Sequence, residues 1–279
     1  MVPVIERILV SFLIAFSAIC SQAAASPSGE PIPVGDLRLW HQIFRDDFNR
    51  EVPLGGYPSH HDCGGRVYPA SKWCPYPDGW HDTSRLGTYM PSRVMSNHDG
   101  ILDLYLHTFR GVPRVAAPVP LLPGSIGGHT RDLRYGRYAV RFRSAPLHCY
   151  KTAWLLWPDS GVWPRDGEID FPEGNLDSTI HGFVHYQNGT SGSDQYAMPD
   201  TGVTYRRWHT AVILWRPRFV RFRLDGRLVG QTRKRIPNTP MHWVLQTETG
   251  LGGCVPAPST AGHVRIDWVA VWKAVWRRG

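Results

Sequence analysis

Hydrophobic and polar residues alternate in short runs along most of this chain, and turn residues separate the runs. Residues 101–106 (ILDLYL) follow an Asp-Gly pair, and residues 219–224 (FVRFRL) end at another. A period of two places every second side chain on one face, as in a half-buried β-strand bounded by tight turns. The 24 prolines spread along the 279 residues oppose long helices, because proline removes a helix donor and clashes with the preceding turn. This pattern predicts an all-β protein.

Composition excludes other classes of chain. Aromatic residues make up 12% of the sequence, whereas disordered chains have few of them. The formal charge is +8, which fits either a solvated basic surface or attraction to an acidic wall polymer or a membrane surface. Arginines interleave with aromatic residues in 216–227, as they can in nucleic-acid-binding proteins. Their alternation fits a strand with one solvated face better, so no nucleic-acid partner is predicted.

The first 25 residues have the layout of a secretory signal peptide. Glu6 and Arg7 precede an apolar run from Ile8 to Cys20, and small residues follow up to Ala25. The run is shorter than the roughly 20 apolar residues that a membrane-spanning helix needs. We therefore expect cleavage near Ala25, export of the protein and no membrane span.

The mature chain is expected to hold one domain. Residues 26–36 (SPSGEPIPVGD) are rich in Pro, Gly and Ser and are predicted to be a linker. Residues 37–279 show no internal repeat and no second linker, and their length suits one large β-sandwich domain.

Four cysteines remain after the first 25 residues are removed. An even number in an oxidising compartment favours disulfides over free thiols, and no CxxC pair suggests zinc. Three pairings are open; in one of them a bond between Cys63 and Cys74 closes a short loop, and a bond between Cys149 and Cys254 joins distant strands.

Acidic residues are concentrated in residues 163–175 (WPRDGEIDFPEGN). On a strand, Glu168 and Asp170 share a face, whereas Glu173 would point to the other. Pro172 has no N–H group and is expected at an edge or a bulge. A bulge inserts one extra residue, so it would bring all three carboxylates to one face.

Three carboxylates on one face repel one another when ionised, so at least one should have a raised pKa, as a proton donor at neutral pH needs. The alternatives are a solvated acidic face or a calcium site. The apolar residues around the carboxylates favour catalysis over both. A pair of carboxyl groups is the usual equipment for glycoside hydrolysis, but offsets along the strand do not distinguish retaining from inverting geometry.

The acidic segment resembles the E-x-D-x-x-E signature of glycoside hydrolase family 16, in its laminarinase-like branch. The likeness extends from about residue 40 to residue 276. The further segments that carry it, in chain order, are Phe44–Phe48, Asp99–Leu102, Tyr135–Tyr138, Ala153–Leu156, Trp163–Pro164, Phe183–Tyr186, Trp208–Thr210 with Asp225–Gly226, and Ile266–Trp272. Each match is short, but their order is specific.

The resemblance implies a β-jelly-roll sandwich of two curved antiparallel, concanavalin-like sheets whose concave face holds a polysaccharide. It makes Glu168 the nucleophile and Glu173 the general acid and then the base. Asp170 would hydrogen-bond to the nucleophile, and a covalent glycosyl-enzyme would give net retention.

The resemblance also implies substrate-binding residues. Trp154 and Trp163 would form sugar-stacking walls, and His185 would reach the site. The chain departs from the family pattern at Ala139, where an acidic residue is common, and at Pro172 inside the signature. The departures bear on the substrate more than on the reaction.

The function expected from this resemblance is that of a secreted, monomeric, retaining endo-β-glycanase, with endo-β-1,3-glucanase as the specific activity. The alternatives are a transglycosylase, a galactan-active enzyme or a non-catalytic lectin-like module. No metal or other cofactor is assigned, and a structural calcium site stays open because no ligand set is identifiable. The expected partner is the polysaccharide substrate.

Overall fold

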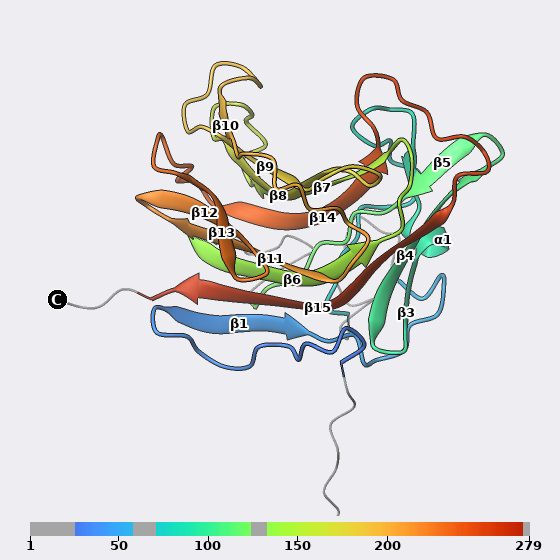
Figure 1. Ribbon diagram of the computed structural model, residues 1–279, viewed down its shortest axis with the longest axis horizontal. Coiled ribbons are helices and arrows are strands. Elements are labelled where there is room, and N and C mark those ends of the chain that lie inside the picture. Colours follow the sequence, from blue (N-terminus) through green and yellow to red (C-terminus); the bar gives the residue numbers. More distant parts are fainter. Residues whose placement is uncertain (1–25, 58–70, 124–132, 276–279) are drawn as a thin grey trace, which may run out of the picture.

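Two β-sheets pack face to face in the computed structural model, which describes residues 26–57, 71–123 and 133–275 (Figure 1). The larger sheet runs in the order β13-β12-β11-β6-β15-β4-β5-β2, with β1 paired to β15 and β3 paired to β4. Its strands are β1 (Trp40–Asp46), β2 (Thr88–Tyr89), β3 (Met95–His98), β4 (Ile101–Phe109), β5 (Val112–Val115), β6 (Gly136–Ser144), β11 (His209–Arg216), β12 (Phe219–Leu224), β13 (Arg227–Thr232) and β15 (Gly262–Ala274). The short β2–β5 pair is parallel, and the other described pairs are antiparallel.

The smaller sheet runs in the order β10-β9-β8-β7-β14 and is antiparallel throughout its described pairs. Its strands are β7 (Tyr150–Pro158), β8 (Glu168–Asn175), β9 (His181–His185), β10 (Gln195–Ala197) and β14 (Met241–Thr249). The described residues contain one helix, α1 (Pro91–Val94). No described helix is long and apolar enough to cross a membrane.

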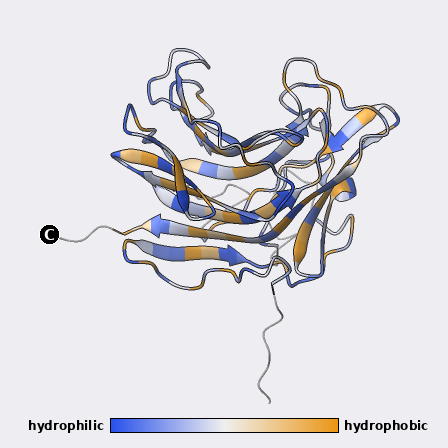
Figure 2. Cartoon of the chain, in the orientation of Figure 1, coloured by the Kyte–Doolittle hydropathy of each residue, from blue (hydrophilic) through white to orange (hydrophobic). Residues whose placement is uncertain are grey.

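The core forms between the sheets because side chains alternate along their strands, as the hydropathy colouring shows (Figure 2). On β6, Tyr138 and Phe142 point inward and are buried, whereas Arg141 between them reaches the outer face. Phe142 meets Trp154 of the opposite sheet edge-on, with ring centroids 5.1 Å apart. Tyr138 meets Trp243 at 5.3 Å. These contacts confirm the predicted two-sheet sandwich.

Residues 26–36 lie against the outer face of the larger sheet, so they do not behave as the linker that their composition predicts. Trp268 donates its indole N–H to the Glu30 carbonyl oxygen at 2.9 Å, and Trp272 donates to the Gly35 carbonyl oxygen at 2.9 Å. Glu30 also pairs with Arg141 at 2.9 Å. We name residues 26–36 the N-terminal strap, because they cover two tryptophans that point away from the main core.

A disulfide joins the β6–β7 connection to the β14–β15 connection, and each of these connections links the larger sheet to the smaller one. Cys149, just before β7, is bonded to Cys254, which follows β14, across a separation of 105 residues. Cys74 is also disulfide-bonded, and its expected partner Cys63 lies outside the described residues. The signal peptide predicted for residues 1–25 lies outside them too.

Candidate functional site

Strand β8 carries the three acidic side chains, and its pairing contains one extra residue. From Asp170 to Glu173 the strand advances three residues, while its neighbours advance two, over 153–155 on β7 and 181–183 on β9. This is the predicted bulge, and it confirms that Glu173 faces the same side of the sheet as Glu168 and Asp170. That side is the outer face of the smaller sheet, away from the main core.

Glu168 and Asp170 lie beside His185 of β9. The imidazole Nε2 is 3.8 Å from a Glu168 carboxylate oxygen and 3.6 Å from an Asp170 oxygen. Gly167 has φ +74°, and a Cβ there would lie 2.6 Å from the His185 carbonyl oxygen. A side chain at residue 167 would therefore push β8 away from β9 next to the point where the two acids meet the imidazole. Glycine permits this close approach.

Burial is the main cause of the pKa shifts of Glu168, Asp170 and His185. Desolvation raises the pKa of Glu168 to about 7; the charge of Glu173 also raises it, while hydrogen bonds from Asp170 and Trp163 lower it. Desolvation raises the pKa of Asp170 well above its usual value, followed by the charges of Glu168 and Glu173. Desolvation lowers the pKa of His185, which favours a neutral imidazole. Burial therefore favours the protonated form of Asp170, which can share its proton with Glu168.

Glu173 is held by a buried cation that the sequence analysis did not identify. Lys151 Nζ on β7 lies 2.8 Å from Glu173 Oε1 and 3.4 Å from Glu248 Oε1 on β14. The Lys151 side chain is 7% exposed. Desolvation alone would lower its pKa, but the charges of Glu173 and Glu248 outweigh this and raise it. Lys151 thus stays charged and partly offsets the acidic cluster.

Two tryptophans lie beside the acidic residues: Trp163, which the sequence analysis predicted, and Trp157, which it did not. Trp163 is 38% exposed and meets His185 edge-on at 5.5 Å. Trp157 stacks with Trp163 at a centroid distance of 6.4 Å. Trp154 is fully buried in the core, so the prediction that it forms a sugar wall is wrong.

Strand alternation explains why Trp157, and not Trp154, lies on the face that carries the acids. Ala153 and Leu155 pair with Glu173 and Asp170, so odd-numbered residues of β7 face the acids and even-numbered residues face the core. Trp157 lies on the acidic face by this count. The register could have identified it, whereas family spacing pointed to Trp154.

A tyrosine from the segment before β2 borders the same cluster. Burial raises the pKa of Tyr76 to about 12, and the charges of Glu168 and Glu248 add to the effect. Tyr76 contacts the ring of Trp80 at 5.6 Å, and Trp80 is 45% exposed. The composition of residues 50–84, rich in Gly, Pro, His and Trp, suggests a long loop that lines a cleft, but it does not identify Tyr76, which lies about 90 residues before the acidic strand.

The site also has the composition of a possible cation site. One ligand atom each from Glu168, Asp170 and His185 lies within 4.8 Å of the others. Two carboxylates and an imidazole can hold a divalent ion. The raised pKa values of both carboxyl groups mean that a proton competes with any cation here.

The raised pKa values predict a pH-dependent stability. Native Glu168 binds its proton more tightly than the unfolded chain does, so its contribution to stability falls as the pH rises from about 4.5 to about 7. Asp170 acts in the same direction. We expect Asp170→Asn to gain stability relative to wild type as the pH rises over this range, measured by thermal unfolding. The control is Asp99→Asn, whose carboxyl group is 94% exposed. A pH-independent difference for Asp170→Asn would contradict the burial argument.

Replacing Lys151 should destabilise the protein. Lys151→Met leaves Glu173 and Glu248 without their shared counter-ion, and breaking a buried ion pair from one side costs about 3–5 kcal/mol. Urea unfolding at pH 7 measures the loss. Lys72→Met is the matched control: Lys72 is 55% exposed and pairs with Asp46 at 3.1 Å, a surface contact worth about 0–1 kcal/mol. Equal losses in the two variants would show that Lys151 is not a structural counter-ion.

Comparisons with known proteins show what this chain is similar to. The model of the family described as "Glycosyl hydrolases family 16" matches residues 114–270. A β-glucanase of Acetivibrio thermocellus is 28% identical over 122 residues, which cover 42% of this chain and 35% of the relative. A β-glucanase of Brevibacillus brevis is 25% identical over 145 residues, which cover 48% of this chain and 54% of the relative. The chain thus spans about a third and about half of the lengths of these two curated relatives.

Among solved structures, the laminarinase from Rhodothermus marinus superposes with a TM-score of 0.65 at 22% identity. The superposition covers 85% of this chain and 98% of that one. At this identity the likeness shows a shared fold, and it extends the match beyond the residues that the family model covers.

Proposed function

Because this chain belongs to glycosyl hydrolases family 16, we propose that it is a secreted, endo-acting β-glucanase that cleaves β-1,3-glucosidic bonds with net retention. The observation that carries the proposal is the β8 bulge, which brings Glu168, Asp170 and Glu173 to one face beside Trp163. The names of the relatives support the substrate class: two are β-glucanases and one is a laminarinase.

The proposed reaction assigns one role to each carboxyl group. Ionised Glu168 attacks the anomeric carbon, while Glu173 donates a proton to the departing glycosidic oxygen. The resulting glycosyl-enzyme ester is then attacked by water, whose proton returns to Glu173. Asp170 keeps its proton and donates a hydrogen bond to Glu168. This hydrogen bond stabilises the Glu168 carboxylate before it attacks and again when it leaves the sugar.

Lys151 suits this cycle, because the charge on Glu173 changes twice in each turnover. When Glu173 is ionised, the lysine can pair with it at 2.8 Å; when Glu173 is protonated, Glu248 at 3.4 Å offers a second anion. His185, as a neutral imidazole, can orient the two acids without adding charge. We also propose that residues 37–279 form the catalytic domain and that residues 1–25 direct export.

The polysaccharide products test this proposal. We expect the purified protein to release short oligosaccharides from a soluble β-1,3-glucan from the first minutes, with a rapid loss of viscosity. The anomeric configuration of the first products, followed by NMR, reports retention. A mixed-linkage β-glucan and a galactan measured in parallel reveal the linkage preference. Release of monosaccharide alone, or products only from galactan, would overturn the endo-β-1,3-glucanase proposal.

Trp163 should act mainly in binding. Its exposed indole presents a flat apolar face to a sugar ring, so Trp163→Ala should raise KM by about tenfold with a smaller change in kcat. Trp163→Phe keeps a ring but removes the N–H group that hydrogen-bonds toward Glu168. We expect the Phe variant to recover most of the affinity. If Ala and Phe variants lost affinity equally, stacking would not be the role of this residue.

A further inference from the structure

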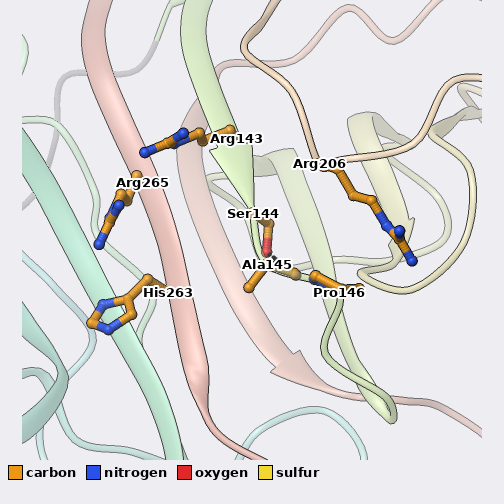
Figure 3. A pocket seen from close by; sticks show the side chains of 7 residues that line it. All are labelled: Arg143, Ser144, Ala145, Pro146, Arg206, His263 and Arg265. Carbon is orange, nitrogen blue, oxygen red and sulfur yellow. Dashed lines mark hydrogen bonds between the residues drawn. The ribbon is translucent and has the colours of Figure 1, made fainter. Parts of the chain in front are cut away.

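A basic pocket lies on the outer face of the larger sheet, on the opposite side of the sandwich from the acidic cluster (Figures 1 and 3). It has a volume of about 380 Å³. Its lining residues are Arg143, Ser144, Ala145, Pro146, Arg206, His263 and Arg265. Figure 3 shows Arg143, Arg265 and His263 on two neighbouring strands and Arg206 across the 144–146 segment from them. We name it the outer pocket.

Strand register brings two of these arginines together. Arg143 of β6 and Arg265 of β15 are direct partners in the antiparallel ladder, so their side chains leave the sheet on the same side. Like charges directly opposite each other on adjacent strands destabilise a sheet. The pairing of Arg143 with Arg265 therefore does not stabilise the sheet by itself.

A single buried carboxylate offsets only part of this charge. Asp103 is 6% exposed and already faces three partners: His263 at 2.7 Å, His98 at 3.4 Å and Arg265 at 3.6 Å. Within the described part of the chain, Arg143 and Arg206 form no ion pair. Arg143 instead lies over the ring of Trp208, with its guanidinium carbon 4.9 Å from the centroid. The outer pocket thus has an unbalanced positive charge.

Basic side chains continue along this face beyond the outer pocket, but they contact other groups. Further along β6, Arg141 pairs with Glu30 of the N-terminal strap, and Arg137 lies 5.2 Å from the ring of Trp272. A duplex nucleic acid is usually held by a track of phosphate contacts along a surface. A single pocket of this size, with an indole beside it, instead suits one sugar ring that bears an anionic group.

We propose that the outer pocket binds a carboxylate- or sulfate-bearing sugar unit of an acidic polysaccharide. Guanidinium forks bind such planar or tetrahedral oxyanions by two parallel hydrogen bonds. Arg143 and Arg265 contact the anionic group, and Arg206, whose side chain points away from them in Figure 3, adds positive charge at the rim of the pocket. Trp208 lies beneath the Arg143 guanidinium and helps to hold it in place. Because the pocket and the acidic cluster lie on opposite faces of the sandwich, a wall polymer can hold the protein without occupying the cleavage site.

Binding to defined polysaccharides tests the proposal. Heparin serves as the sulfated probe, polygalacturonate as the carboxylated probe, laminarin as the neutral probe and short duplex DNA as the competing macromolecule. Binding is measured by calorimetry in full-length Glu168→Gln protein, so that no probe is degraded. We expect Arg143→Gln/Arg265→Gln to weaken binding of an acidic polysaccharide by about tenfold or more.

The matched control removes the same charge elsewhere. Arg218 and Arg227 are exposed residues at the ends of the β11–β12 and β12–β13 turns and do not line the outer pocket. Arg218→Gln/Arg227→Gln should change the affinity by less than about twofold, since distant surface charges are screened by salt. Arg206→Gln is a second test that removes neither the like-charge pair nor the Trp208 contact, and we expect it to weaken binding as well.

Several outcomes would overturn the proposal. They are the absence of acidic-polysaccharide binding, equal weakening by the pocket and control pairs, and tighter binding of DNA with the same arginine dependence. Hydrolysis of neutral glucan by the pocket variants, made without the Glu168 change, should match wild type. If no protein hydrolysed any glucan, the proposed enzyme activity would fail while the binding result stood.

Discussion

Glu168→Gln should lose hydrolysis by about four orders of magnitude or more, because an amide cannot form the glycosyl-enzyme bond. Glutamine preserves the shape of the side chain and can still accept the hydrogen bond from Asp170. Sugar binding should therefore survive, with the affinity for a β-1,3-glucan oligosaccharide within about threefold of wild type. Stopped assays with purified protein give kcat, and calorimetry gives the affinity.

The variant also separates catalysis from binding alone. The change of charge sits in a buried group, so thermal unfolding must show that the protein remains folded. Asp99→Asn again provides a surface control with the same kind of substitution. Normal hydrolysis by folded Glu168→Gln would falsify the nucleophile assignment, and loss of binding together with activity would mean that Glu168 mainly holds the substrate.

Glu173→Gln should lower kcat on a polysaccharide by about 10²–10⁴-fold, the usual contribution of general acid–base catalysis. The loss should depend on the leaving group. An aryl glycoside with an acidic phenol needs little protonation on departure, so its first step should stay fast while the glycosyl-enzyme accumulates. Pre-steady-state release of the phenol measures this burst.

The two glutamate variants must therefore differ. Glu168→Gln should show no burst with the same aryl glycoside, because it forms no covalent intermediate. Glu173→Gln also removes a charge from Lys151, which keeps Glu248 as its partner, so its stability should fall less than that of Lys151→Met. Identical behaviour of both variants with the aryl substrate would contradict the assignment of distinct roles.

The arrangement of the acidic strand was predictable because a proline within a run of alternating residues indicates an irregularity in the strand. Pro172 requires an irregular position in the sheet, and one extra residue restores Glu173 to the face of Glu168. The period of two predicted the all-β class, whereas the arrangement in two curved sheets was what the family resemblance implied. The structure confirms the bulge and the two sheets.

The residues that sequence reasoning missed depend on contacts between distant segments. Lys151 becomes a counter-ion only because β7 lies between β8 and β14. Tyr76 reaches the acids from a segment that has no regular strand pattern. Trp154 was misplaced for a different reason: a family motif locates a tryptophan along the chain, but only the register of β7 decides which face it occupies.

The N-terminal strap was misread because composition describes how a free segment behaves. Residues rich in Pro, Gly and Ser form flexible linkers when they have nothing to pack against. Here the chain offers two indole N–H donors and Arg141 on the adjacent sheet, and these contacts order the segment.

That covering has a practical consequence for making the protein in the laboratory. A shortened version that begins at residue 37 would uncover Trp268 and Trp272 together with their apolar neighbours, and it would lose the anion opposite Arg141. Exposed aromatic patches of this kind promote self-association. Removing residues 26–36 for crystallisation would thus promote self-association, whereas a protein that starts at Ser26 would keep the two tryptophans covered.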